Sequence, residues 1–336
     1  MTVNIGLIGA GRMGQVFGHH LAFSVPGVKL IAVADTNGAQ AADVAARYAA
    51  SASYADFHAL LERQDVDAVV IATPTHTHVE VVRAATAAGK QIFCEKPLAL
   101  TLAGCDEAIA AAEAAGVKLQ VGFMRRYDPA YRAAKEKIDA GLIGAPVMFK
   151  SIGRDPKRTS LEFARRENSG GLIADMAIHD FDLARWLMGS EVVRVHSEGE
   201  CLVYPELKDV GDIDNAVVNL KFANGAVGNV DVSRNAVYGY DIRTEVLGAR
   251  GSLLIGKLQQ TPLLVLTTDG VTHDTVPYFM ERFPEAYAAE IRDFAECIRA
   301  DRSPAVSGED ARAATAIGIA ATRSLDAGRP VALSEL

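Results

Sequence analysis

Apolar residues in the first part of the chain follow a single pattern. Five short apolar runs have the length and composition of β-strands, and they lie at residues 3–10, 28–35, 66–73, 91–96 and 118–123. Alanine-rich segments with helical spacing of their apolar residues lie between them, at 39–48, 78–88 and 102–115. Continuously apolar strands that alternate with helices are typical of a parallel sheet covered on both faces. The pattern predicts an α/β domain, a doubly wound parallel Rossmann sheet, over residues 1–122.

The pattern differs in the rest of the chain, where apolar and polar residues alternate in many short runs. Turn signals such as Ala223-Asn224-Gly225 separate several of these runs. Period-two alternation with hairpin turns predicts that residues 123–336 form an α+β domain with a large, mostly antiparallel open sheet, one face of which is solvated or covered by a partner. The helical segments lie at 123–141, 174–188, 286–300 and 309–327, and the strand-like segments lie at 146–153 and, seven of them, between 191 and 276.

Composition limits the class of protein. The chain has 336 residues, of which 49% are hydrophobic and 23% charged, as in a soluble protein with about two domains. A formal net charge of -8 argues against a nucleic-acid partner. No apolar run reaches the length of a membrane span. The four cysteines lie far apart without metal-ligand spacing, and a strand-like run begins almost at the first residue, so we expect a cytoplasmic protein with free thiols and no metal.

A glycine-rich turn follows the first predicted strand. Its sequence is G-A-G-R-M-G, with Gly9, Gly11 and Gly14 at the spacing of a dinucleotide-binding turn and with Arg12 and Met13 between them. Gly9 permits the tight turn, Gly11 lets the backbone approach a pyrophosphate, and Gly14 lets the following helix pack closely. The start of that helix supplies free N–H groups for the phosphates. The turn therefore predicts a dinucleotide cofactor held by these five residues.

An acidic residue ends the second predicted strand. Asp35 lies 21 residues after Gly14, where a carboxylate can accept hydrogen bonds from a ribose diol and would repel a 2′-phosphate. Thr36 and Asn37 add no positive charge beside it. The sequence predicts NAD rather than NADP as cofactor.

Two later strands end in residues that can do chemistry. Thr73-Pro74 follows one strand and Glu95-Lys96-Pro97 follows the next, and ligands of such sheets lie outside the carboxyl ends of the strands. We therefore expect Thr73, Pro74, Glu95 and Lys96 to border the cofactor, together with His78 at the start of the following helix. The alternative is a strand end whose charged residues simply reach water.

The segment D-M-A-I-H-D-F-D contains the densest set of ionisable residues. Asp175 and His179 are four residues apart, so both side chains project from one helix face. A histidine held by an aspartate can act as a general base, although the same spacing also occurs in ordinary surface pairs. We expect Asp180 and Asp182 to project elsewhere, to solvent or to neighbouring groups that they cap.

Together these motifs resemble the Gfo/Idh/MocA oxidoreductase family. The two-domain order, the G-A-G-R-M-G turn, Glu95-Lys96-Pro97 and the Asp175-x-x-x-His179 helix match the family over nearly the whole chain. The segments F-C-E-K-P-L-A, Q-V-G-F-M-R-R-Y-D and Y-G-Y-D are narrower signals, similar to the inositol 2-dehydrogenases of that family.

The resemblance implies a role for each matching position. Lys96 would bind and polarise the reacting hydroxyl, and the physics agrees, because a cation stabilises a developing alkoxide. Pro97 would fix the turn, through a cis bond if the chain uses one. His179 would be the general base, with Asp175 as its partner and as a further contact to substrate hydroxyls.

The resemblance also implies residues that line a substrate pocket. Arg125 of F-M-R-R-Y-D and Tyr240 of Y-G-Y-D would contact a polyol, and we expect Arg126 to point away into an ion pair. Asp155 stands where inositol enzymes often have Asn, and its carboxylate can accept hydrogen bonds from sugar hydroxyls. This departure leaves the exact substrate open.

These observations predict an NAD-dependent dehydrogenase of a cyclic polyol, with myo- or scyllo-inositol ahead of an aldose. A sugar dehydrogenase for glucose, galactose or a rarer aldose is the alternative, and a nucleotide-binding regulator without turnover is a third hypothesis. We expect a homo-oligomer, a dimer or a tetramer, because the open sheet offers a surface for association.

Overall fold

The computed structural model describes residues 2–336 and divides into two compact units. The first unit contains the chain up to Tyr127 together with Glu285–Thr315. The second contains Asp128–Pro284 and Ala316–Leu336. A segment near the C-terminus therefore belongs to the same compact unit as the predicted nucleotide-binding sheet.

The first unit is built on a six-stranded parallel sheet with the strand order β3-β2-β1-β4-β5-β6. This order confirms the doubly wound sheet that the apolar runs predicted. The direction of winding reverses between β1 and β4, which is where ligands bind in such sheets. One edge strand, β3, has only three residues and was missed. The strands are β1 (Val3–Ile8), β2 (Val28–Ala34), β3 (Ala52–Tyr54), β4 (Ala68–Ile71), β5 (Gln91–Glu95) and β6 (Leu119–Gly122).

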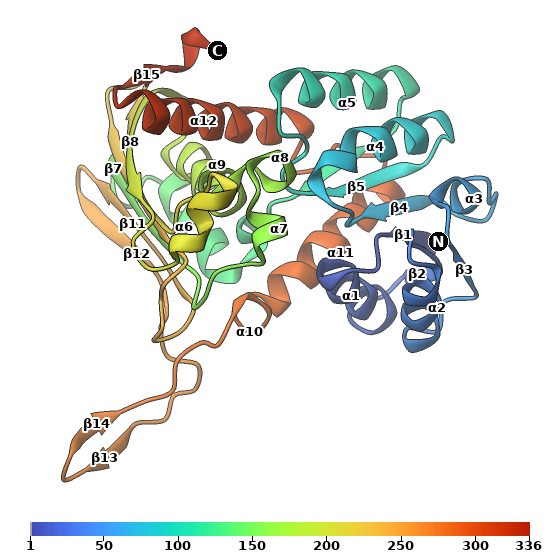
Figure 1. The fold of residues 1–336 in the computed structure, drawn as a ribbon, viewed down its shortest axis with the longest axis horizontal. Coiled ribbons are helices and arrows are strands. Elements are labelled where there is room, and N and C mark those ends of the chain that lie inside the picture. Colours follow the sequence, from blue (N-terminus) through green and yellow to red (C-terminus); the bar gives the residue numbers. More distant parts are fainter. Residues whose placement is uncertain (1) are drawn as a thin grey trace. The chain divides into compact units, whose positions relative to one another are not determined.

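Helices cover both faces of this sheet: α4 and α5 lie on one face, and α1 and α11 on the other (Figure 1). On the second face, Phe93 of β5 packs edge-on against Phe17 of α1 and Phe294 of α11, with ring centroids 5.2 and 5.9 Å apart. The helices of this unit are α1 (Arg12–His19), η1 (His20–Ser24), α2 (Gly38–Arg47), α3 (Phe57–Leu61), η2 (Thr75–Thr77), α4 (His78–Ala87), α5 (Leu102–Ala115), η3 (Met124–Tyr127) and α11 (Pro284–Ala300).

The second unit is built on a seven-stranded sheet with the order β12-β11-β7-β10-β9-β8-β15. Every neighbouring pair is antiparallel except β7 and β10, which are parallel, so the prediction of a mostly antiparallel sheet is confirmed. The strands are β7 (Pro146–Arg154), β8 (Val192–Glu200), β9 (Asn215–Phe222), β10 (Val227–Ser233), β11 (Asp241–Gly248), β12 (Gly251–Gly256) and β15 (Val331–Ala332). A separate hairpin of β13 (Val265–Thr267) and β14 (Gly270–Thr272) projects away from this sheet (Figure 1).

Helices cover one face of this sheet and leave the other open. Along β9, Val218 and Leu220 are buried whereas Val217 is 41% exposed, which is the alternation expected of a sheet with one covered face. The helices of this unit are α6 (Pro129–Asp139), α7 (Leu161–Ala164), α8 (Arg166–Ser169), η4 (Ile173–Ala177), α9 (Ile178–Met188), η5 (Pro205–Val210), α10 (Phe279–Arg282) and η6 (Leu333–Glu335), and α12 (Gly308–Ala327) is divided between the units at Thr315.

The predicted helix over residues 123–141 begins later than expected. Asp128 is the N-cap of α6, and its carboxylate accepts hydrogen bonds from the N–H groups of Ala130 and Tyr131. Pro129 occupies the first helical turn, where its missing N–H is not needed. Residues 124–127 therefore form a separate 3₁₀ turn, η3, directly after β6.

Candidate active site

The glycine-rich turn has no room for side chains at two of its three glycines. Gly9 has a φ of +98°, and a Cβ added there would lie 2.5 Å from the carbonyl oxygen of Ala72. A Cβ at Gly14 would lie 2.0 Å from the carbonyl oxygen of Gly9. The turn thus packs against the end of β4 and against its own helix as the fingerprint predicts.

The space beside Gly11 is open, since a Cβ there would meet no atom within 4 Å. Gly11 is also the N-cap of α1 and has no side chain to accept from the first N–H groups of that helix, which begins with Arg12 and Met13. Open space and uncapped N–H groups at a helix start fit a pyrophosphate. The residues present are therefore those that a dinucleotide needs.

Asp35 is bonded to the same turn. Its Oδ2 accepts from the N–H of Ala10 at 2.7 Å, and its Oδ1 accepts from the N–H of Asn37 at 2.8 Å. Gln40 donates to the carbonyl oxygen of Ala10 at 2.8 Å. The carboxylate therefore fixes the glycine-rich turn, a role that the sequence did not reveal, and its bond to a ribose stays a prediction.

His78 connects two strand ends. Its Nδ1 lies 2.8 Å from the carbonyl oxygen of Pro97, and its Nε2 lies 3.0 Å from the carbonyl oxygen of Thr73. The side chain is 1% exposed, and burial lowers the pKa of the imidazole. Pro74 starts the short helix η2 between Thr73 and His78. His78 therefore holds together the turns after β4 and β5 from within the protein.

The turn after β5 carries the predicted polarising lysine. The Lys96–Pro97 peptide bond is cis. Glu95 is 7% exposed, and its Oε2 accepts from the N–H of Lys96 at 3.1 Å. Gly122 is the partner of Glu95 on β6, and a Cβ there would lie 3.2 Å from Glu95 Oε1. The carboxylate of Glu95 is thus packed beside the turn that bears Lys96.

The two arginines after β6 differ in their surroundings. Arg125 is 3% exposed and lies in the turn η3. Arg126 pairs with Asp310, with 3.0 Å between Arg126 Nη2 and Asp310 Oδ1. The predicted ion pair of Arg126 is confirmed. A role of Arg125 in substrate binding stays a prediction.

In the second unit, Asp175 and His179 lie on one continuous helical segment of two kinds. Asp175 belongs to the π-helix η4, and His179 belongs to the α-helix α9 that follows without a break. The expected single α-helix therefore has a more loosely wound π-helical turn at Asp175. Such turns often occur at functional sites. His179 is 8% exposed.

Asp180 and Asp182 are buried, so of the two expectations for them, solvent or capping of neighbouring groups, the first is wrong. They are 0% and 1% exposed, because α9 packs on β7 and β10 and is enclosed on nearly all sides. Asp180 accepts a hydrogen bond from Ser151 of β7. This bond holds the start of α9, next to His179, against the sheet.

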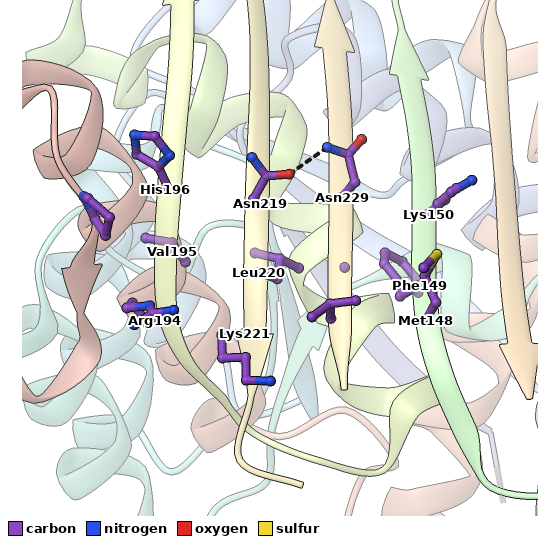
Figure 2. Close-up of a pocket in the computed structure, with 13 residues that line it drawn as sticks. Met148, Phe149, Lys150, Arg194, Val195, His196, Asn219, Leu220, Lys221 and Asn229 are labelled. Carbon is purple, nitrogen blue, oxygen red and sulfur yellow. Dashed lines mark hydrogen bonds between the residues drawn. The ribbon is translucent and has the colours of Figure 1, made fainter. Parts of the chain in front are cut away.

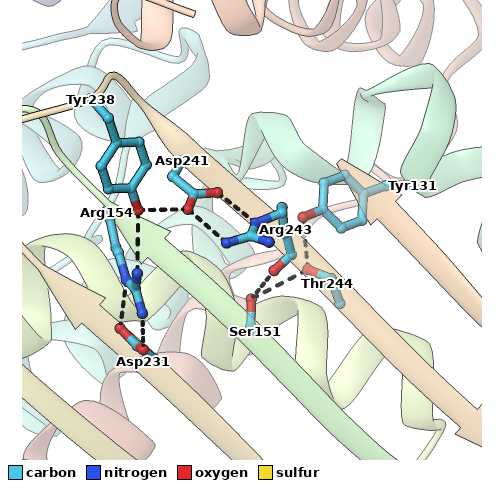
Figure 3. Close-up of polar contacts among 8 residues, drawn as sticks. All are labelled: Tyr131, Ser151, Arg154, Asp231, Tyr238, Asp241, Arg243 and Thr244. Atoms are coloured by element: carbon cyan, nitrogen blue, oxygen red, sulfur yellow. Dashed lines mark hydrogen bonds and ion pairs between the residues drawn. The ribbon is translucent and has the colours of Figure 1, made fainter. Parts of the chain in front are cut away.

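Ser151 belongs to a small polar network inside the second unit. Its hydroxyl lies 3.2 Å from that of Thr244, which in turn lies 2.8 Å from the hydroxyl of Tyr131 (Figure 3). These residues come from β7, β11 and α6, and the network links those elements with α9. No sequence motif indicated it.

A second network in Figure 3 lies around the ends of β7, β10 and β11. Arg154 pairs with Asp231 and donates to the hydroxyl of Tyr238, which donates to Asp241. Asp241 also accepts from Arg243 at 2.7 Å. The network orders the Tyr238–Asp241 segment that contains the predicted substrate residue Tyr240.

Asp155 makes two backbone hydrogen bonds, and Tyr240 packs against a neighbouring ring. The N–H of Asp155 donates to the carbonyl oxygen of Ser233 at 2.8 Å, and its own carbonyl accepts from Ala236. The ring of Tyr240 is 6% exposed and lies edge-on to Tyr278 at 5.7 Å. Their contacts with a substrate stay predictions.

Arg234 is the residue of this unit that sequence reasoning missed. It is 1% exposed, and both of its terminal nitrogens lie 3.3 Å from Oδ2 of Asp175. Asp212 approaches the same guanidinium, with 3.8 Å between Asp212 Oδ2 and Arg234 Nη2. The predicted partner of the histidine is therefore itself held by a buried cation.

Neither a metal-ligand cluster nor a membrane-spanning helix is found over residues 2–336. No group of three or more His, Cys, Asp or Glu in this range could hold a metal ion. No helix within it is long and apolar enough to cross a membrane.

A parallel sheet with a glycine turn open to a pyrophosphate defines a dinucleotide-binding protein, and comparisons with known proteins identify its class. The sequence model described as "Oxidoreductase family, NAD-binding Rossmann fold" matches residues 3–123. The model described as "Oxidoreductase family, C-terminal alpha/beta domain" matches residues 135–333. The chain belongs to the Gfo/Idh/MocA oxidoreductase family, and its cofactor is NAD.

Individual relatives match over almost the full length. The chain is 42% identical to the scyllo-inositol 2-dehydrogenase (NAD(+)) of Bacillus subtilis, covering 98% of this chain and 96% of that protein. It is 39% identical to the myo-inositol 2-dehydrogenase of Thermotoga maritima, covering 99% of each chain. Among solved structures, the scyllo-inositol dehydrogenase of Lactobacillus casei with bound NAD(H) and scyllo-inositol matches with a TM-score of 0.94, at 29% identity and with 99% and 100% of the two chains covered.

Proposed function

We propose that the protein is an NAD-dependent dehydrogenase that oxidises a secondary hydroxyl of a cyclic polyol, myo- or scyllo-inositol, to the inosose. The observation that carries this proposal is the full-length similarity, at about 40% identity, to relatives named as inositol dehydrogenases. The retained Lys96, Asp175 and His179 support it, because a regulator without turnover has no need of a base and a polarising cation.

The proposed reaction divides the chemistry between cofactor and protein. When bound, NAD accepts a hydride at C4 of its nicotinamide. The ammonium of Lys96 stabilises the negative charge that develops on the substrate oxygen. The imidazole of His179 accepts the hydroxyl proton, and Asp175 orients that imidazole and stabilises its protonated form. Arg125, Asp155 and Tyr240 are proposed to contact the other hydroxyls.

A panel of substrates tests the proposal. NADH formation is measured by absorbance with inositol isomers and with glucose, galactose and rarer aldoses, using NAD and NADP in parallel. The proposal expects the highest kcat/KM for myo- or scyllo-inositol with NAD. Preference for an aldose would favour the sugar dehydrogenase alternative, which the carboxylate of Asp155 keeps open, and NAD binding without any turnover would favour a regulator.

The open face of the second sheet supports a homo-oligomer, a dimer or a tetramer. Figure 2 shows a shallow hollow on this face lined by Arg194, His196, Asn219 and Lys150 among other residues. Exposed apolar residues lie on the same sheet and on the β13–β14 hairpin, namely Val147, Val217, Val227, Leu247, Leu263, Leu266 and Val271. Sedimentation velocity tests this part of the proposal, and a monomer at micromolar concentration would contradict it.

The cysteines bear on the compartment. Cys94, Cys105, Cys201 and Cys297 are all free and buried. Free thiols suit a reducing environment, and we place the enzyme in the cytoplasm on that ground. Fluorescence microscopy of the tagged protein in its host cell tests the cytoplasmic location.

A further inference from the structure

The strongest feature that the proposed chemistry does not use is the buried guanidinium of Arg234. This residue directly follows β10, and its side chain is 1% exposed. It meets two carboxylates, Asp175 at 3.3 Å and Asp212 at 3.8 Å. A guanidinium cannot lose its proton in a protein, so this position always carries a positive charge. Isolated from water, that charge is tolerated because carboxylates surround it.

Backbone hydrogen bonds fix the main chain from which the guanidinium projects. The N–H of Arg234 donates to the carbonyl oxygen of Asp214 at 2.9 Å, and the preceding residue, Ser233, accepts from the N–H of Asp155. The position of Arg234 is thus set by the ends of β7 and β10 and by the segment before β9. A side chain anchored in this way can act as a fixed reference for a neighbouring helix.

Asp212 fixes the helix that bears Asp175 from the other side. Its Oδ1 accepts from the N–H of Leu172, the residue directly before η4, at 2.8 Å. A Cβ at Gly171 would lie 2.6 Å from the same oxygen, so the carboxylate reaches the helix start across a glycine. Asp212 and Arg234 therefore both act on the segment from residue 171 to Asp175.

Charges from three segments meet here within the second unit, two carboxylates and one guanidinium. Asp175 comes from η4, Asp212 from the chain before β9 and Arg234 from the chain after β10, whereas Asp180 on α9 is bonded to Ser151 of β7. Burial raises the pKa of Asp212, and Arg234 opposes this shift. A carboxylate that shares its charge with a cation stabilises a nearby imidazolium less. The cation thus favours a neutral His179, four residues beyond Asp175 in the same helical segment.

We propose that Arg234 is a positioning residue for the base: it fixes the carboxylate of Asp175 and keeps His179 neutral, and therefore able to accept a proton, at neutral pH. The proposal rests on the proposed function for its kinetic readout. Asp212 has the opposite electrostatic effect, since its carboxylate draws part of the charge of Arg234 away from Asp175. Arg234 does not touch the reacting atoms in this scheme.

Two variants test the inference through opposite shifts. R234Q removes the cation, and we expect it to move the acid limb of the kcat–pH profile to a higher pH, by about one pH unit or more. D212N removes a carboxylate, and we expect it to move the same limb to a lower pH. R234K keeps the positive charge but loses the planar guanidinium, so the acid limb should stay at the same pH while kcat falls. Should R234Q fail to fold, D212N carries the test, because its amide oxygen can still accept from Leu172.

R282Q is the matched control. Arg282 forms another buried pair in the same unit, with Arg282 Nη1 2.8 Å from Asp128 Oδ2. Its loss lowers the Tm as R234Q does, but it leaves the acid limb where it was. If R234Q and R282Q both lose only thermal stability, and D212N shifts nothing, Arg234 is merely structural and the inference is overturned.

A second readout separates this inference from the proposed function. The titration of His179 is followed by NMR with ¹³Cε1-labelled histidine, using H179N to assign its signal, and it needs no substrate. If no polyol is oxidised but R234Q still moves the His179 titration upward, the proposed function fails and the inference stands. If inositol is oxidised and the titration stays in place, the inference fails alone.

Discussion

The two units hold their predicted site residues by different means. In the nucleotide-binding unit, three of these residues have main-chain partners. Asp35 accepts from two backbone N–H groups, His78 lies against two backbone carbonyls, and Glu95 accepts from the N–H of the residue beside it. The positions of these side chains therefore depend on the conformation of the backbone.

In the second unit, Asp175 and the neighbouring Asp180 have side-chain partners from distant parts of the sequence. Asp175 is held by Arg234, 59 residues away, and Asp180 by Ser151, 29 residues away. These contacts are between charged or hydroxyl groups inside a unit that buries them almost completely. The helix that carries His179 is therefore positioned by tertiary contacts rather than by its own turn geometry.

This difference indicates which substitutions disturb the site residues of each unit. A site made of main-chain bonds depends on backbone shape, and so on glycine and proline positions such as Gly9, Gly14 and Pro97. A site made of buried side-chain pairs depends on charge balance, because removing one partner leaves the other charge buried and uncompensated. We expect mutations at these backbone positions to act on cofactor affinity in the first unit, and mutations in the buried pairs to act on proton transfer in the second.

The largest expected effects come from the two groups assigned to catalysis, one in each unit. Lys96→Ala and His179→Ala each lower kcat by about 10²–10⁴-fold, because a polarising cation or a general base is lost. The dissociation constant for NAD, measured by fluorescence titration, changes little in either variant. His196→Ala, on the open sheet face, is the control and keeps normal turnover. If either variant keeps a near-normal kcat, the substituted residue has no catalytic role, and the unit that carries it does not supply a catalytic group.

Sequence predicted the first unit well because its signals are local. The glycines of the turn are demanded by a positive φ at Gly9 and by a backbone contact of 2.0 Å at Gly14, and both demands appear as a motif of six residues. The continuous apolar strands gave the parallel sheet for the same reason. The edge strand β3 was missed, since three residues with partial burial carry no clear apolar pattern.

The second unit was predicted at the level of strands but not of contacts. Alternation located six of the seven strands of the sheet and missed β15. Solvent was one of the two expectations for Asp180 and Asp182, because charged residues on a helix usually mark its exposed face. α9 is enclosed, and its charges have partners such as Ser151 instead. Arg234 belongs to no motif, and pairing over 59 residues leaves no trace in a single sequence.

We expect an intermediate effect from substitution of Asp35, whose carboxylate accepts from two main-chain N–H groups. Asp35→Ala removes an acceptor for the N–H groups of Ala10 and Asn37 as well as the proposed ribose contact. Bonds to a charged acceptor contribute about 1.5–3 kcal/mol, so we expect a rise of at least about tenfold in the KM for NAD and weaker discrimination against NADP. The measurement is kcat/KM with each cofactor.

Asp43→Ala is the control for this comparison, because Asp43 is exposed on the neighbouring helix α2 and pairs with the exposed Arg47. It should leave both cofactor constants as they are. If Asp35→Ala changes the KM for NAD and NADP by the same factor, the carboxylate serves the turn alone, and the assignment to the ribose is wrong.

The last prediction concerns stability rather than kinetics, and a buried carboxyl of the first unit that no main-chain group holds among residues 2–336. Glu290 of α11 is fully buried, and among residues 2–336 neither of its carboxyl oxygens has a hydrogen-bond partner. Phe93 and Glu95 share a face of β5 as Phe294 and Glu290 share a face of α11, and the two phenylalanine rings lie 5.9 Å apart. Burial, and then the charge of Glu95, raise the pKa of Glu290 well above its usual range.

The sign of the pH dependence follows from that shift. Between the pKa of an unfolded glutamate and the raised pKa in the folded protein, the folded state binds more protons, so its stability falls as the pH rises. Glu290→Gln cannot ionise, so below that window the two proteins have similar free energies of unfolding, and within it the variant gains about 1.4 kcal/mol per pH unit over the parent. Urea unfolding at pH 5, 6, 7 and 8 measures the difference.

Glu296→Gln is the matched control, because Glu296 lies on the same helix but is about half exposed. Its unfolding free energy should keep a constant offset from the parent across this range. If Glu290→Gln also shows a constant offset, Glu290 has an ordinary pKa and does not qualify the comparison. If the offset grows with pH, a protonated carboxyl lies buried beside Glu95, and the nucleotide-binding unit also depends on a tertiary charge that its motifs do not reveal.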